Sequence, residues 1–166
     1  MSAVSKKDEL LPGPLDGIRV LDFSMFLAGP YCTRLMADLG AEIIKVEPPG
    51  GDFLRNAPPY RNGQSAYFAH MNCGKKSIVL DLKSNKGRQA ILKLIHTVDV
   101  VLENFRPGVM ARLDLDYTAL SALRPELVYC AVSGYGQTGP GSQRPAFAPI
   151  IHAASGHDLI MMNYQG

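Results

Sequence analysis

Residues 127–141 read LVYCAVSGYGQTGPG, an apolar run followed by four glycines and one proline. The apolar part, residues 127–132, is typical of a buried strand. The glycine-rich part then breaks the chain where this strand leaves its sheet. In open α/β sheets, ligands bind outside the carboxyl ends of the strands, and glycine lets the backbone approach a ligand closely. An ordinary loop has the same pattern, so a binding role depends on which residues come after the other strands.

Further apolar segments predict four more strands, at residues 18–23, 42–46, 77–82 and 99–103. Between them, Pro30 is expected at the first position of a helix, and Ser84 is expected to cap a helix that runs to about residue 97. Alternation of strands and helices implies a parallel sheet with right-handed crossovers. The predicted fold class is therefore α/β and Rossmann-like, a mostly parallel sheet with flanking helices.

Shorter elements complete this prediction. Residues 52–74 are expected to be irregular and loop-rich, because they contain Pro58, Pro59, Gly63 and Gly74. Short helices are expected at residues 109–113 and 117–123, and a last helix from about Pro149.

Composition restricts the class of protein. With 166 residues, 46% of them apolar and 19% charged, the chain is one globular domain or a large part of one. A net charge of +2 gives no support to nucleic-acid binding. No apolar run reaches the roughly 18 residues of a membrane span, and the N-terminus lacks the apolar region of a signal peptide. We expect a cytoplasmic protein with no membrane partner, whose residues 1–14 are a flexible lead.

The sequence predicts no metal site. The cysteines, Cys32, Cys73 and Cys130, are far apart and are expected to be buried thiols. His152 and His157 are five residues apart, a spacing that does not place two ligands on one helix face. No Ser-His-Asp or Cys-His arrangement stands out. Asp22, Asp38, Asp81 and Asp158 are candidate carboxylates, but nothing local singles one out as catalytic, and most are expected to be caps or surface charges.

Two common nucleotide-binding motifs are incomplete. The turn after the first strand contains only Gly29, whereas a dinucleotide fold needs three glycines there, although Glu47 stands where an acid would contact the ribose. Residues 73–77 contain a Gly-Lys step, but they lack the upstream glycine of a phosphate loop and precede a strand.

Residues 103–108 read ENFRPG and come directly after the fourth strand. Asn104, Phe105 and Arg106 place an amide, an aromatic ring and a guanidinium at a strand end. These groups suit an adenine and a phosphate, and Arg112 could add a second charge. The alternative is an ordinary loop with exposed cations.

Together these segments resemble the family III CoA-transferases, which include formyl-CoA transferase, carnitine CoA-transferase and α-methylacyl-CoA racemase. The matching segments are residues 15–23, 27–30, 37–47, 72–77, 80–83, 101–108 and 133–140.

The resemblance implies that residues 15–166 are the CoA-binding N-terminal part of a larger domain, incomplete by themselves, from an interlocked homodimer. The substrates would be an acyl-CoA and a carboxylic acid acceptor, with no metal. The aspartate nucleophile would lie beyond Gly166, so the chain alone is expected to be inactive and to self-associate. By resemblance, the CoA contacts are Leu27, Ala28, Leu80, Asp81, Leu82, Lys83, Asn104, Phe105, Arg106 and Arg112.

Two departures from the family keep alternatives open. Pro48 stands where many members have a basic residue that helps to hold the CoA phosphates, which leaves room for a non-catalytic CoA-binding or dimer-forming subunit. Racemases have Gly-His-Asp where this chain has Ala146, Phe147 and Ala148. Racemisation needs proton donors and acceptors on both faces of the α-carbon, so a racemase is the weaker alternative.

Overall fold

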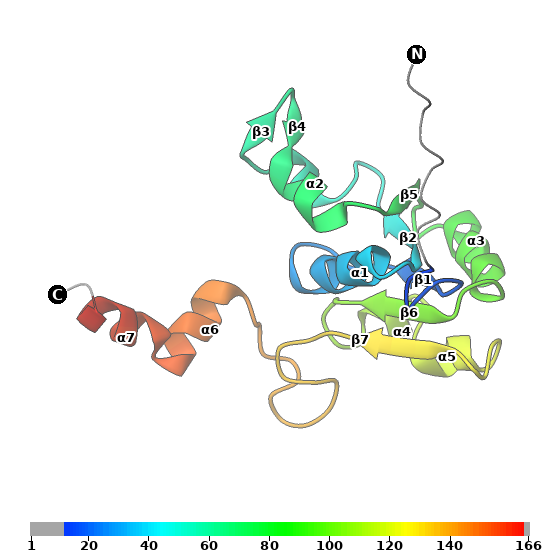
Figure 1. The fold of residues 1–166 in the computed structure, drawn as a ribbon. Coiled ribbons are helices and arrows are strands. Elements are labelled where there is room, and N and C mark those ends of the chain that lie inside the picture. The colour runs from blue at the N-terminus through cyan, green and yellow to red at the C-terminus, as the bar shows by residue number, and fades with distance from the viewer. Residues whose placement is uncertain (1–11, 165–166) are drawn as a thin grey trace, which may run out of the picture.

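A five-stranded parallel sheet forms the centre of the protein in the computed structural model, which describes residues 12–164 (Figure 1). The strand order is β5-β2-β1-β6-β7. The strands are β1 (Arg19–Asp22), β2 (Glu42–Glu47), β5 (Lys76–Val79), β6 (Val100–Glu103) and β7 (Val128–Ala131). The predicted α/β class with a mostly parallel, helix-flanked sheet is confirmed.

The chain changes direction across this sheet at β1. From β1 it moves outward through β2 to β5, and then returns to the other side of β1 to form β6 and β7. The carboxyl ends of β1 and β6 therefore lie side by side at the point where the strand order reverses. Such a switch point is where open α/β sheets bind ligands.

Helices cover both faces of the sheet. Leu21 and Val101 point to one face, where they pack against α3 (Asn85–Ile95), α4 (Val109–Arg112) and α5 (Tyr117–Ser121). Val20, the neighbour of Leu21, points to the opposite face, where Met36 of α1 (Ala28–Asp38) packs. This alternation is the two-residue period of a strand, and burial of both faces explains why the strands read as nearly continuous apolar runs.

The helix starts were predicted with mixed success. Ser84 caps α3 as expected, because its Oγ accepts a hydrogen bond from the Gly87 N–H at 3.0 Å. The expected start of α1 is too late: the helix begins at Ala28, so Pro30 is its third residue. Proline is tolerated there because the N–H groups of the first turn have no intrahelical partner.

The prediction of irregular structure over residues 52–74 was wrong. This segment contains the 3₁₀ helix η1 (Phe53–Asn56), a hairpin of β3 (Tyr60–Arg61) and β4 (Gln64–Ser65), and the helix α2 (Ala66–Asn72). Ser65 begins α2, since its Oγ accepts from the Phe68 N–H at 3.1 Å. These elements are too short for their apolar periodicity to stand out in the sequence.

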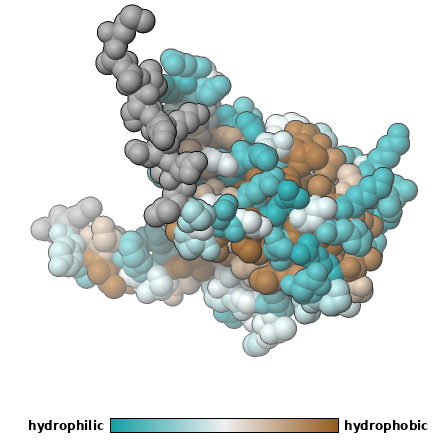
Figure 2. Space-filling view, turned by 45° about the vertical axis from the view of Figure 1, so that its right-hand side comes forward, coloured by the Kyte–Doolittle hydropathy of each residue, from teal (hydrophilic) through white to brown (hydrophobic). Residues whose placement is uncertain are grey.

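The last two helices, α6 (Ala148–Ser155) and α7 (His157–Tyr164), form an arm that extends away from the sheet (Figure 1). Neither helix buries a residue. Apolar side chains are interspersed with polar ones on its surface (Figure 2), and the exposed large ones include Phe147, Ile150, Leu159 and Ile160. Among the helices of residues 12–164, none has the length and apolar character needed to cross a membrane. The expected flexible lead falls mostly outside the described residues.

Candidate functional site

The predicted contact residues lie just beyond the carboxyl ends of three parallel strands. Leu27 and Ala28 come after β1, residues 80–83 after β5, and residues 104–106 after β6. Strands β1 and β6 are neighbours, whereas β2 separates β5 from β1. At about 4.8 Å per strand, the β5 loop is centred about 14 Å from the β6 loop. The structure therefore spreads these residues along one edge of the sheet, which suits an elongated ligand.

Asn104 joins two of these loops. Its Oδ1 accepts a hydrogen bond from the Met25 N–H at 2.8 Å, and its Nδ2 donates to the Met25 carbonyl at 2.7 Å. The amide was predicted to contact the edge of an adenine ring. In the structure it holds the β1 loop against the β6 loop, and only one N–H and one lone pair are left for a ligand.

Phe26 is a feature of this edge that the sequence did not reveal. Its φ is 64°, in the left-handed region that an aromatic residue rarely adopts. The ring is 47% exposed and lies 5.6 Å from that of Phe53, centroid to centroid. Leu27, the next residue, is 50% exposed. Strained backbone of this kind is concentrated at ligand sites, and here it turns two apolar side chains outward at a strand end.

The glycine-rich loop and the ENFRPG loop meet at one cavity. This cavity, of about 480 Å³, opens at the carboxyl ends of β6 and β7 and is lined by Arg106, Gly108, Tyr117, Tyr129 and Gln137, among others. Gln137 belongs to the glycine-rich loop, so the sequence segment that first suggested a binding role does reach a candidate site. Arg112 is exposed at the end of α4 and is not among the residues that line the cavity.

Burial raises the pKa values of two titratable groups that line this cavity. Glu103 is 4% exposed, and this burial raises the pKa of its carboxyl. The Phe105 N–H donates a hydrogen bond to the carboxyl at 2.7 Å and partly lowers this pKa again. Burial also raises the pKa of the Tyr129 phenol, with further contributions from Glu103 and Asp116. Tyr129 therefore keeps its proton at neutral pH, where it can act as a hydrogen-bond donor.

A larger cavity, of about 640 Å³, lies at the opposite edge of the sheet and is lined by charged residues. These charges neutralise one another: Arg19 pairs with Glu42 at 3.1 Å, and Arg124 pairs with Asp99 at 2.8 Å. We assign the site to the carboxyl edge, because ligands of parallel sheets bind there. The exposed cations Lys83 and Arg106 at this edge form no ion pair with another side chain of residues 12–164.

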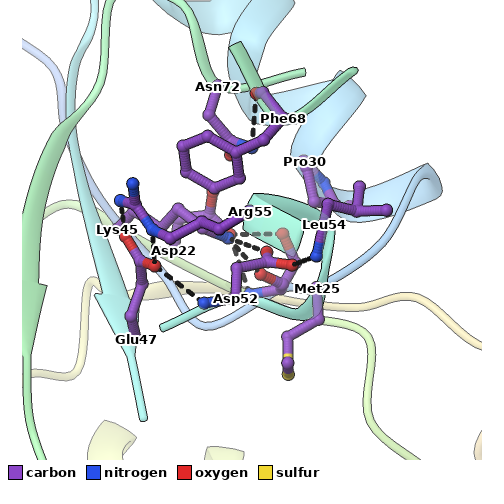
Figure 3. A network of polar contacts seen from close by, with 12 residues as sticks. Asp22, Met25, Pro30, Lys45, Glu47, Asp52, Leu54, Arg55, Phe68 and Asn72 are labelled. Atoms are coloured by element: carbon purple, nitrogen blue, oxygen red, sulfur yellow. Dashed lines mark hydrogen bonds and ion pairs between the residues drawn. The ribbon is translucent and has the colours of Figure 1, made fainter. Parts of the chain in front are cut away.

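A buried polar network supports the loops after β1 and β2 (Figure 3). Lys75 Nζ lies 3.0 Å from Asp22 Oδ2, and Lys45 Nζ lies 2.9 Å from Asp52 Oδ2; all four side chains are at most 1% exposed. Asp22 is therefore an exception to the expectation that most of the candidate carboxylates are caps or surface charges. Lys75 Nζ also donates to the Pro30 carbonyl at 2.8 Å, which ties the start of α1 to the sheet.

Glu47 belongs to the same network. Burial raises the pKa of its carboxyl, but hydrogen bonds from Arg55, Ser77 and the Asp52 N–H outweigh this effect and lower the pKa to about 2. Arg55 donates to both oxygens at 2.6 Å. Glu47 is thus an ionised structural anchor that is already fully bonded, which agrees with the absence of a dinucleotide motif in the sequence.

The expectation about the thiols needs correction, and two histidines lie closer together than their spacing in the sequence indicated. Cys73 is exposed, while Cys32 and Cys130 are half-buried, so the thiols are not uniformly buried. His152 and His157 were not expected to share a helix face, yet their ring centroids lie 4.5 Å apart. The reason is that α6 ends at Ser155 and Gly156 adopts a φ of 73°, so the two histidines belong to different helices.

Comparisons with known proteins show which family the chain resembles. A family model described as CoA-transferase family III matches residues 15–165. The chain is 48% identical over 145 residues to an acetyl-CoA:oxalate CoA-transferase of Acetobacter aceti, covering 87% of this chain and 37% of the relative. It is 43% identical to a succinyl-CoA:glutarate CoA-transferase of Mus musculus, covering 86% of this chain and 33% of the relative.

Among solved structures, a CAIB/BAIF family protein from Brucella suis matches with a TM-score of 0.82 and 39% identity. The match covers 88% of this chain and 40% of that protein. The chain thus spans between a third and two fifths of the length of these relatives.

Proposed function

The chain belongs to CoA-transferase family III, and we propose that it forms the CoA-binding part of an enzyme that transfers CoA from an acyl-CoA thioester to a carboxylic acid. The observation that carries this proposal is the convergence of the β6 and β7 loops on one cavity, next to the β1 loop that Asn104 holds in place.

The exposed groups at this edge fit the parts of CoA. Arg106 and Arg112 are exposed guanidinium groups that can bind phosphates. Phe105, half-buried, offers a ring face to an adenine, and Leu27 and Ala28 offer apolar surface to the pantetheine arm. Residues 80–83, farther along the edge, include the exposed Lys83 as a further cation. These residues bind and orient the thioester; they supply no nucleophile.

The nucleophile of the transfer reaction is proposed to be an aspartate that lies beyond Gly166. Its carboxylate attacks the thioester carbonyl, which gives a mixed anhydride and releases the CoA thiolate. The thiolate then attacks the aspartyl carbonyl, releasing the first acid and forming an aspartyl-CoA thioester. The acceptor carboxylate attacks this thioester to give a second mixed anhydride and free thiolate. Attack of that thiolate on the acceptor carbonyl forms the new acyl-CoA and restores the aspartate.

The proposal includes a homodimer and a cytoplasmic location. The arm of α6 and α7 exposes several large apolar side chains and buries none of its residues, and exposed apolar surface of this kind often marks an interface with another chain. In the proposed protein, a second copy packs against the exposed apolar side chains of this arm.

A non-catalytic CoA-binding subunit is the second candidate. It is favoured by Pro48, which comes after Glu47 at a position where the family often has a cation for the CoA phosphates. In this candidate the chain binds CoA but no aspartyl thioester ever forms. The two candidates therefore differ in a covalent intermediate.

The test is to read the coding DNA beyond residue 166 for a Gly-Asp step, and then to assay the protein with that segment included. Acetyl-CoA and succinyl-CoA are the donors, with oxalate and glutarate as acceptors, because these acids occur in the names of the relatives. We expect transfer of CoA and, after brief incubation with the donor, a protein whose mass is increased by that of CoA less one water, as an aspartyl-CoA thioester requires. CoA binding without CoA transfer and without a covalent adduct would exclude the transferase and favour the non-catalytic CoA-binding subunit.

A further inference from the structure

His152, His157 and Asp158 meet at the junction of α6 and α7, and we propose that they bind a divalent transition-metal cation of the Zn²⁺ type. The cluster lies in the arm, whereas the proposed CoA contacts lie in loops at the edge of the sheet. The proposal does not rest on the transferase function.

The backbone brings the three side chains together. In one continuous helix, residues five apart would point about 140° away from each other around the axis. Here α6 ends, Gly156 takes the left-handed conformation with a φ of 73°, and α7 begins at once with His157. Because the chain turns at this glycine, the ring of His157 lies close to that of His152, and Asp158 lies beside both.

The distances are close to those of a tetrahedral site. Asp158 Oδ1 lies 3.6 Å from His152 Nδ1 and 3.7 Å from His157 Nδ1. One ligand atom from each of the three residues lies within 4.8 Å of the others. In a tetrahedral Zn²⁺ site with bonds of about 2.0–2.1 Å, neighbouring ligand atoms are about 3.4 Å apart. Small side-chain rotations are enough to reach that geometry.

The ligand chemistry selects the class of cation. Two imidazoles and one carboxylate suit Zn²⁺, Co²⁺ or Ni²⁺, whereas Mg²⁺ and Ca²⁺ need more oxygen ligands. Three protein ligands leave the fourth position of a tetrahedral site to water. The three side chains are about half exposed, at 47%, 52% and 58%, so a hydrated cation can reach them.

Metal binding would have a structural consequence for the arm. The ligands come from both helices, so a bound ion fixes the angle between α6 and α7, and binding to the folded junction stabilises it. The alternative is a pair of simple ion pairs between Asp158 and the two histidines, which needs no metal.

The proposal is tested by titrating metal-free protein with Zn²⁺ at neutral pH, with a chromophoric chelator as competitor. We expect one strong site in the unmodified protein. His152→Ala and Asp158→Asn are each expected to weaken Zn²⁺ binding at least about tenfold. The matched control is His96→Ala, because His96 is an exposed histidine at the end of α3, in the body of the protein; it is expected to leave Zn²⁺ binding unchanged.

Co²⁺ provides a second readout. Bound by imidazole and carboxylate, Co²⁺ is expected to give visible d–d bands that disappear in His157→Ala. A thiolate-to-cobalt charge-transfer band would instead locate the ion at a cysteine such as the exposed Cys73 and would overturn the proposal. Zn²⁺ binding that is absent, or that is unaffected by His152→Ala, would overturn it equally. Circular dichroism checks that each variant keeps its helices.

Discussion

Replacing Lys75 with methionine is expected to destabilise the protein by about 3–5 kcal/mol. The Lys75 and Asp22 side chains are 1% and 0% exposed, and the substitution leaves the Asp22 carboxylate buried without its cation. Thr33 Oγ1 and the Ser24 N–H still donate to Asp22, at 2.6 and 2.8 Å, but neither carries a charge. The measurement is chemical unfolding of both proteins at the same pH.

The control is the double variant Asp22→Asn with Lys75→Met. It removes both charges and keeps the approximate shape of both side chains, so part of the lost stability is expected to return. A single variant as stable as the unmodified protein would show that this pair does not hold the β1 loop. Equal losses in the single and double variants would show that the loss comes from packing and not from the unpaired charge.

Replacing Gly29 with alanine is expected to destabilise the protein by about 1–3 kcal/mol and to weaken CoA binding. A Cβ at this position would overlap with Ser24 Cβ and would lie 3.1 Å from Leu102 Cδ2. Because Ser24 and Gly29, the latter in the first turn of α1, lie on either side of Phe26 and Leu27, relief of this overlap must move the loop between them. Thermal unfolding and CoA titration measure the two effects.

Gly141→Ala is the matched control for this change. Gly141 also lies in a loop, its φ is not positive, and an added Cβ would make only ordinary contacts, the nearest at 3.7 Å with Tyr135. We expect its stability and CoA affinity to stay close to those of the unmodified protein. If Gly29→Ala behaves like Gly141→Ala, the close approach of Ser24 and Gly29 does not shape the site.

The sheet could be predicted from the sequence because its strands are local apolar runs. Residues 18–23 and 99–103 are such runs, and each lies within a residue or two of an observed strand. The helix α2 could not be predicted in this way, since seven residues between a hairpin and a turn carry too little periodicity. Ser65, as a possible helix cap, was the sequence signal for this helix. Pro58 and Pro59 come shortly before it and favour a loop, so the signal was missed.

The site was predicted less completely, because it depends on pairings between distant residues. The loops after β1 and β6 could be located, but the clamp of Asn104 on Met25 spans 79 positions and is not visible in either segment alone. Burial of Asp22 likewise depends on Lys75, 53 positions away. The unusual φ of Phe26 has no sequence signal, since aromatic residues rarely adopt that conformation.

If CoA binds at the carboxyl edge of the sheet, Arg106 contributes to that binding, and this is the most direct test of the site. The measurement is calorimetric titration of CoA into the protein, into Arg106→Met, and into Arg61→Met, which removes an exposed arginine of β3. We predict saturable binding that Arg106→Met weakens at least about tenfold, or about 1.4 kcal/mol, and that Arg61→Met leaves unchanged. Absence of saturable binding, or an equal loss in both variants, would contradict a CoA site at this edge.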